Sequence, residues 1–134
     1  MLLFLNRISG YTADGIRLNQ PAGHLEAGES LLQAVIRKTR EETGYHFKPD
    51  CLVGFYRWHN QSNDMTFLRC VFAGSEYEPI PQAELDQGII RAVWMSREEL
   101  LACPDKHRSP LVMQCITDWI VSSRYNLSLL KDLG

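Results

Sequence analysis

Apolar side chains recur with helical spacing between Leu31 and Thr43, and this is the clearest structural signal in the chain. Ser30, followed three residues later by Gln33, matches a capping box, which begins a helix. Gly44 supplies a C-terminal stop. The pattern therefore predicts an amphipathic helix over residues 31–43. Its expected inward stripe consists of Leu31, Leu32, Val35, Ile36 and Thr39.

Other stretches have the composition of strands. Residues 51–59 and 65–74 are rich in aromatic and β-branched side chains and are separated by the polar turn "NQSND", so we predict an antiparallel pair. Residues 2–5 and 16–18 predict a hairpin around the polar loop "SGYTADG". Residues 89–95, "IIRAVWM", predict a further strand.

The C-terminal third predicts two more helices. Ser96 and Glu99 repeat the capping-box spacing, and the short helix that they begin should end before Pro104. A last helix should begin at Pro110 after an acidic loop (75–88) and the strand and helix that follow it. The side chains expected to point inward are Leu111, Val112, Cys115, Ile116 and Trp119. This order of strands and helices predicts an α/β or α+β fold with two or more layers.

Composition narrows the class of function. The 134 residues, 45% hydrophobic and 22% charged, suit a single domain over residues 1–134. A formal net charge of −2 argues against a nucleic-acid partner, and no apolar stretch approaches membrane-spanning length. The four cysteines contain no CxxC pair, so we expect reduced thiols in a cytoplasmic protein. Small-molecule chemistry is the remaining expectation.

Two adjacent carboxylates, Glu41 and Glu42, lie beside the apolar stripe of the predicted helix. Each follows a cation by four residues, Arg37 for Glu41 and Lys38 for Glu42. A carboxylate pair of this kind suits Mg²⁺, which commonly binds one or two carboxylates together with substrate phosphates and water. The more common arrangement on helices is a solvated face with i,i+4 salt bridges. The helix alone leaves both interpretations open.

The loop before the predicted helix favours the metal site over the solvated face. Residues 23–45, "GHLEAGESLLQAVIRKTREETGY", resemble the Nudix box, G-x5-E-x7-R-E-U-x-E-E-x-G-U, where U is a bulky apolar residue. The matching fixed residues are Gly23, Glu29, Arg37, Glu41, Glu42 and Gly44. The segments "NQPAGHLE", "FLR", "RSPLV" and "RY" look like the branch of small Nudix phosphatases that act on nucleoside di- and triphosphates and on thiamine-pathway pyrophosphates.

The resemblance implies a fold, a reaction and a set of roles. The fold would be a Nudix-type α/β/α sandwich with a mixed sheet. The activity would be hydrolysis of a small phosphorylated substrate with Mg²⁺, or Mn²⁺, as cofactor. Carried over by position, Glu41 and Glu42 are the metal carboxylates, Glu29 and Arg37 a supporting charge pair, and the Ala22 carbonyl a further ligand.

The box departs from the family pattern at two positions. Lys38 stands where the family has a metal-binding glutamate, and Thr39 stands at the bulky apolar position. One interpretation is an enzyme in which Glu41, Glu42 and substrate phosphates still hold one metal ion. The other is a catalytically silent protein that binds nucleotides or diphosphates. The family also has a strand before residues 2–5, so the sheet is expected to lack its first strand or to be completed by residues upstream; dimerisation would cover the edge, and we expect a monomer or homodimer.

The predicted strand pair carries candidate substrate contacts. Arg57 and Arg69 alternate with apolar residues, and each is expected to project from a sheet face toward a substrate cleft, or else to form a salt bridge at the rim. Trp58 shares the other face with Tyr56 and would stack on a heterocycle or belong to the core.

Three further residues are candidates from loops. Asp86 lies in the acidic loop, a region from which Nudix proteins often supply an extra acid for the metal; the alternative is a solvated charge. His24 would contact a phosphate or transfer a proton, or else make a loop hydrogen bond. Arg108, before the last helix, would reach phosphate or serve at the surface.

Overall fold

The structure of the chain is a computed structural model that describes residues 2–8, 16–121 and 124–134. The strands are β1 (Leu2–Ile8), β2 (Ile16–Asn19), β3 (Tyr45–Lys48), β4 (Cys51–Asn60), β5 (Met65–Ala73), β6 (Glu76–Pro79) and β7 (Ile89–Met95). The helices are α1 (Leu31–Thr43), α2 (Arg97–Leu101) and α3 (Leu111–Ile120), with the 3-10 turns η1 (Pro104–Lys106) and η2 (Leu127–Leu129). The expected α+β class is confirmed, and the predicted loop over residues 9–15 lies outside the described residues.

The strands form three antiparallel groups, β2-β1-β7, β3-β6 and β4-β5. The two predicted hairpins, β1 with β2 and β4 with β5, are both present. Strands β3 and β6 were not predicted, and β6 interrupts the expected acidic loop. In the described chain, parallel pairing is limited to a bridge between Leu18 and His107, so the sheet is less mixed than expected.

Strand β1 is paired along both edges. It runs antiparallel to β2 on one side and to β7 on the other. A further strand before it is therefore not needed to cover an edge of β1. No helix of the described chain is long and apolar enough to cross a membrane.

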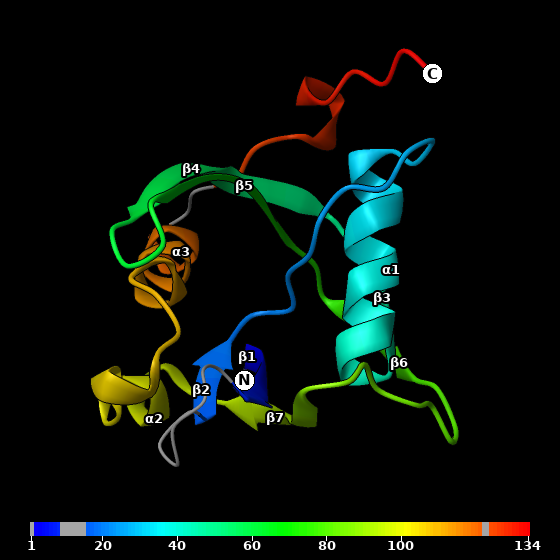
Figure 1. Cartoon of the computed structure of the whole chain (residues 1–134). Helices are drawn as coiled ribbons and strands as arrows, with labels where there is room; N and C mark the ends of the chain where they lie inside the picture. The colour runs from blue at the N-terminus through cyan, green and yellow to red at the C-terminus, as the bar shows by residue number, and fades with distance from the viewer. Residues whose placement is uncertain (1, 9–15, 122–123) are drawn as a thin grey trace.

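Helix α3 joins the upper and lower parts of the molecule (Figure 1). It packs against β4 above, and the core cluster below it combines side chains from β2, α2 and α3. The buried members of this cluster are Leu18, Leu100, Val112 and Ile116. Helix α1 lies on the other side of the molecule, where it contacts β3 and β7. Strand β7 links the two regions, because it contacts α1 and its Val93 and Met95 pack against the core cluster.

Helix α1 has the predicted ends. The Gln33 amide donates to the Ser30 hydroxyl at 3.1 Å, and the Ser30 amide donates to the Gln33 side chain at 2.8 Å. Gly44 adopts a φ of 75°, which favours glycine, and its amide donates to the Arg40 carbonyl at 2.9 Å.

The buried face of α1 differs from the predicted stripe. Leu31 is 36% exposed, whereas Glu42 is 1% exposed and Thr39 and Thr43 are buried beside it. Thr39 tolerates burial because its hydroxyl donates to the Val35 carbonyl at 2.7 Å. The covered surface of the helix therefore turns toward its C-terminal half and includes a carboxylate.

Candidate active site

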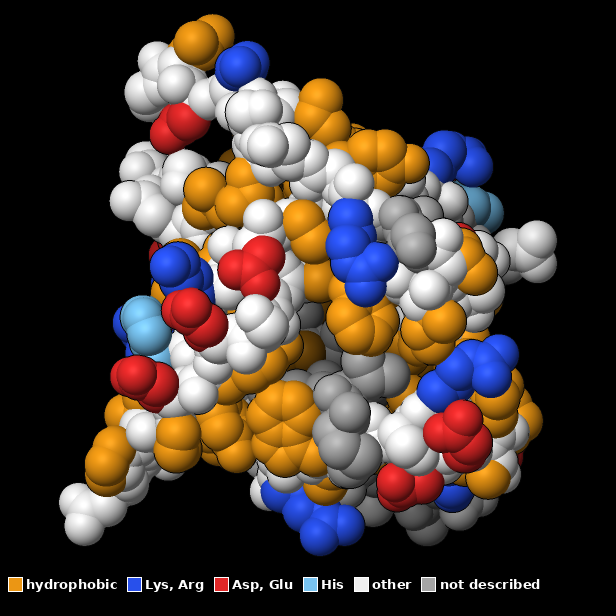
Figure 2. Space-filling view, turned by 180° about the vertical axis from the view of Figure 1, so that it is seen from behind, with side chains coloured by type: hydrophobic (Ala, Val, Ile, Leu, Met, Phe, Trp, Pro, Cys, Tyr) orange, Lys and Arg blue, Asp and Glu red, His pale blue; other side chains and the backbone are white. Residues whose placement is uncertain are grey.

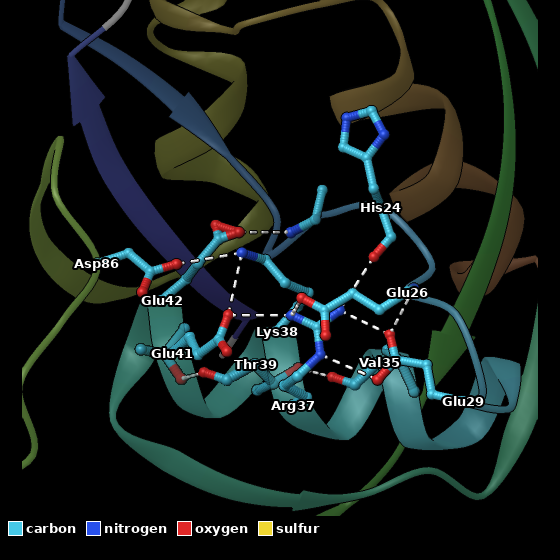
Figure 3. A network of polar contacts seen from close by, with 12 residues as sticks. His24, Glu26, Glu29, Val35, Arg37, Lys38, Thr39, Glu41, Glu42 and Asp86 are labelled. Atoms are coloured by element: carbon cyan, nitrogen blue, oxygen red, sulfur yellow. Dashed lines mark hydrogen bonds and ion pairs between the residues drawn. The ribbon is translucent and has the colours of Figure 1, made fainter.

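Arg37 connects the loop before α1 to the helix (Figure 3). Its guanidinium donates twice to the Glu29 carboxylate, at 3.0 and 2.7 Å, in the bidentate geometry that suits arginine. It also donates to Glu41 Oε2 at 3.1 Å and to the His24 carbonyl at 3.0 Å. Glu26, which the sequence did not single out, lies 3.5 Å from the same guanidinium. The loop and the helix are therefore fixed to each other by one side chain.

The charge pair shifts the pKa of both Glu29 and Arg37. The hydrogen bonds from Arg37, assisted by the Glu26 amide, lower the pKa of Glu29 from 4.5 to about 2. The hydrogen bond to Glu29 raises the pKa of Arg37 in turn. Glu29 is consequently a carboxylate throughout the pH range in which a phosphohydrolase would be assayed.

We expect the pH dependence of stability to report this pair. A carboxylate whose pKa is depressed in the folded chain stabilises it fully above the unfolded pKa, here 4.5, and loses that contribution as the pH falls toward about 2. The difference in unfolding free energy between wild type and Glu29→Gln should be constant at neutral pH and shrink from about pH 4.5 downward. Urea unfolding at fixed ionic strength measures it. The exposed residue Glu84 offers the control Glu84→Gln, and a Glu29 difference that persists undiminished near pH 2 would contradict the pairing.

Lys38 lies between two carboxylates at the other end of this network (Figure 3). Its Nζ is 3.2 Å from Glu41 Oε2 and 3.1 Å from Asp86 Oδ2. Partial burial lowers the pKa of Lys38, but hydrogen bonds to Asp86 and Glu41 and the charge of Glu42 outweigh it, so the pKa lies above its ordinary value. The structure thus brings Asp86 to the box helix, where the Asp86 amide also donates to the Glu41 carbonyl at 2.9 Å.

Glu42 is a buried carboxylate beneath the loop that precedes α1. Its Oε1 accepts a hydrogen bond from the Ala22 amide at 3.1 Å. The sequence placed Glu42 beside the apolar stripe of the helix, whereas the structure buries it and leaves it 1% exposed. The Ala22 group in this contact is its N–H, and ligation by the Ala22 carbonyl stays a prediction.

The donor set suits a hard cation. Carboxylate oxygens of Glu41 and Asp86 already converge on one positive charge, the Lys38 ammonium, and Mg²⁺ and Mn²⁺ favour oxygen ligands of this type. Among the described residues, no three His, Cys, Asp or Glu side chains are gathered into a ready metal cluster. Mg²⁺ held by one or two carboxylates commonly takes its remaining ligands from substrate phosphates and water.

The two candidate arginines of the β4-β5 hairpin point to opposite faces. Arg57 pairs across the strands with Leu68, whereas Arg69 pairs with Tyr56, and directly opposed residues share a face. Arg69, not Arg57, therefore lies on the face of Tyr56 and Trp58, so the two arginines cannot line one face of the hairpin together.

Trp58 and Arg69 take part in a side-chain cluster on their face. The Trp58 and Phe67 rings stack with centroids 5.7 Å apart, and the Arg69 guanidinium lies 5.8 Å from the Phe67 centroid. Tyr56 donates to Asp118 of α3 at 2.7 Å, so this face is turned toward α3. Burial and then the Asp118 hydrogen bond raise the pKa of Tyr56.

The remaining candidates lie at the edges of the site. His24 is exposed, reaches the network through its carbonyl, and directs its ring away from the carboxylates (Figure 3). Arg108 is exposed before α3, and its amide donates to the Leu18 carbonyl at 2.9 Å. On the face seen in Figure 2, described positive and negative side chains are scattered among hydrophobic ones without an extended basic area.

Comparison with known proteins identifies the family of the chain. The model of the NUDIX domain family matches residues 2–115, and the chain belongs to this family of Nudix hydrolases. A NUDIX hydrolase from Nitrosomonas europaea has 48% sequence identity and a TM-score of 0.92, covering 97% of this chain and 86% of that one. Phosphatase NudJ of Escherichia coli (strain K12) is 38% identical over 117 residues, 87% of this chain and 74% of NudJ.

A more distant likeness concerns the fold alone. The MutT protein from Methanosarcina mazei Go1 has a TM-score of 0.69 at 20% identity, and the match covers 91% of this chain and 85% of that one. The chain is thus a Nudix hydrolase with relatives that include phosphatases, and its departure at Lys38 sits inside the family's own motif.

Proposed function

We propose that this Nudix hydrolase cleaves a nucleoside di- or triphosphate or a thiamine-type pyrophosphate in a reaction that depends on Mg²⁺ or Mn²⁺. The observation that carries the proposal is the convergence of Glu41 and Asp86 oxygens, each within 3.2 Å of a common positive charge, beside the buried carboxylate of Glu42. Similarity to a phosphatase supports the phosphate chemistry. The four free thiols support a cytoplasmic location.

Each residue of the network has a part in this reaction. Glu41 and Glu42 would hold the metal, with Asp86 adjacent. The ion, when bound, neutralises phosphate charge and lowers the pKa of a water molecule that attacks phosphorus. Arg37, fixed by Glu29, orients the Glu41 carboxylate, and the Ala22 amide orients that of Glu42. The carboxylates are therefore positioned before the substrate arrives.

A second function follows from Lys38. Its ammonium already forms ion pairs with Glu41 and Asp86, at the motif position where the family has a glutamate. An ammonium at this point repels a divalent cation. This contact favours the alternative of a Nudix-fold protein that binds nucleotides or diphosphates without cleaving them.

The experiment that tests the proposal is phosphate release from a panel of nucleoside di- and triphosphates and thiamine diphosphate, with Mg²⁺ or with EDTA. We expect wild-type protein to release phosphate from at least some members of the panel, and only with metal. Calorimetric binding of the same compounds is measured in parallel. Binding without release across the panel would support the silent binding protein and reject the enzyme.

A further inference from the structure

Lys38 is held in place by contacts from more than one element of the fold. Its ammonium contacts Glu41 on its own helix and Asp86 on the loop before β7, residues separated from it by 3 and 48 positions. Asp86 is held there independently, because its amide donates to the Glu41 carbonyl at 2.9 Å. The ammonium thus lies at the junction of a helix and a loop that are already joined.

The stem of Lys38 is also confined. It passes directly over Gly23, where an added Cβ would lie 2.6 Å from Lys38 Cγ and 2.5 Å from Cδ, distances that real Cβ contacts do not reach. The Lys38 side chain is 20% exposed. The glycine therefore leaves space for the lysine stem, and the ammonium reaches Glu41 and Asp86.

The charges around this position balance differently from those of the usual motif. Arg37 and its partner Glu29 neutralise each other, so Glu41, Glu42 and Asp86 with Lys38 leave three carboxylates and one ammonium, a formal charge of −2 that one divalent cation neutralises. A glutamate at position 38 would leave four carboxylates and a formal charge of −4, which calls for two such ions. Carboxylates this close without enough positive charge repel one another.

We propose that the Lys38 ammonium replaces one divalent ion of this site. It holds Glu41 and Asp86 together before any metal binds, so that the natural chain takes fewer divalent ions than a chain with glutamate at position 38. The inference rests on the proposed metal site, which would then bind its remaining ion through Glu42, Glu41 and the substrate phosphates. Lys38 is therefore a positioning residue, because its positive charge holds the Glu41 and Asp86 carboxylates together.

The test is Mn²⁺ binding and thermal unfolding of the full chain without substrate. Electron paramagnetic resonance titration should show about one more Mn²⁺ bound per chain in Lys38→Glu than in wild type. Lys38→Met keeps the stem over Gly23 but removes the charge, so its Tm in EDTA should lie about 2–5 °C below that of wild type, and this difference should close in Mn²⁺ as the ion takes the vacated position. Lys48, which is exposed and 3.8 Å from Glu76, provides the matched control Lys48→Met, which should resemble wild type in both measurements.

Equal Mn²⁺ numbers in wild type and Lys38→Glu would overturn the inference. So would a Lys38→Met variant whose Tm in EDTA equals that of wild type, or whose difference from wild type does not close in Mn²⁺. These outcomes are separable from failure of the proposed function, which is scored by phosphate release from the wild type alone. A wild type that hydrolyses nothing, with one more Mn²⁺ in Lys38→Glu, would reject the enzyme and keep the role of Lys38.

Discussion

Glu42→Gln is expected to lower metal-dependent phosphate release by about 10²–10³-fold. Lewis-acid stabilisation by a bound metal ion is worth several kcal/mol, and about 1.4 kcal/mol corresponds to a factor of ten in rate. Glu42 is 1% exposed, so no solvent water substitutes freely for its charge at the site. The substitution would therefore remove the proposed metal ligand at a position where the neighbouring exposed groups do not replace it.

Glu42→Gln removes the negative charge of the side chain but keeps its length and an acceptor oxygen. Glutamine keeps an oxygen that can accept the hydrogen bond of the Ala22 amide, now at 3.1 Å, so the loop and the helix should stay joined. Circular dichroism and Tm in EDTA check the fold, and kcat/KM across Mg²⁺ concentrations measures the effect. Glu78 is exposed on β6 and supplies the control Glu78→Gln. Wild-type activity in Glu42→Gln would show that Glu42 is not a metal ligand.

Local patterns predicted α1 because its determinants are local. Capping, periodicity and the glycine stop all act within a few residues, and both caps are as expected. Strands β3 and β6 were missed because each is four residues long and gains its stability from a distant partner. The Phe47 and Tyr77 rings, which stack with centroids 5.5 Å apart, make that contact across the fold.

The contacts of the candidate site were likewise predictable only in part from the sequence. The resemblance to the Nudix box implied a charge pair of Glu29 and Arg37, and these side chains, eight positions apart in the sequence, do meet at 2.7 Å. A helical wheel gives directions around α1 but not what covers them, so it missed the exposure of Leu31 and the full burial of Glu42. The contact of Lys38 with Asp86 depends on the path of a loop 48 positions away and has no local signal.

Arg37→Met is expected to lower kcat/KM by about 10–100-fold, the usual effect of removing a group that orients a metal ligand. The methionine keeps an apolar stem but none of the donors to Glu29, Glu41 and the His24 carbonyl. The carboxylates would then face one another without their shared cation, so the Tm should also fall. Arg40 is exposed on the same helix and gives the control Arg40→Met, which should leave both quantities near wild type.

A double-mutant cycle tests whether Arg37 acts through its contact with Glu29. If Arg37 acts by being fixed on Glu29, the effects of Arg37→Met and Glu29→Gln on kcat/KM should not add, because each removes the same bidentate contact. Arg37→Lys should restore only part of the activity, since an ammonium cannot reproduce the planar fork. Additive losses would mean that Arg37 and Glu29 influence the reaction independently, and the loop before α1 would then owe its position to the Ala22 contact with Glu42.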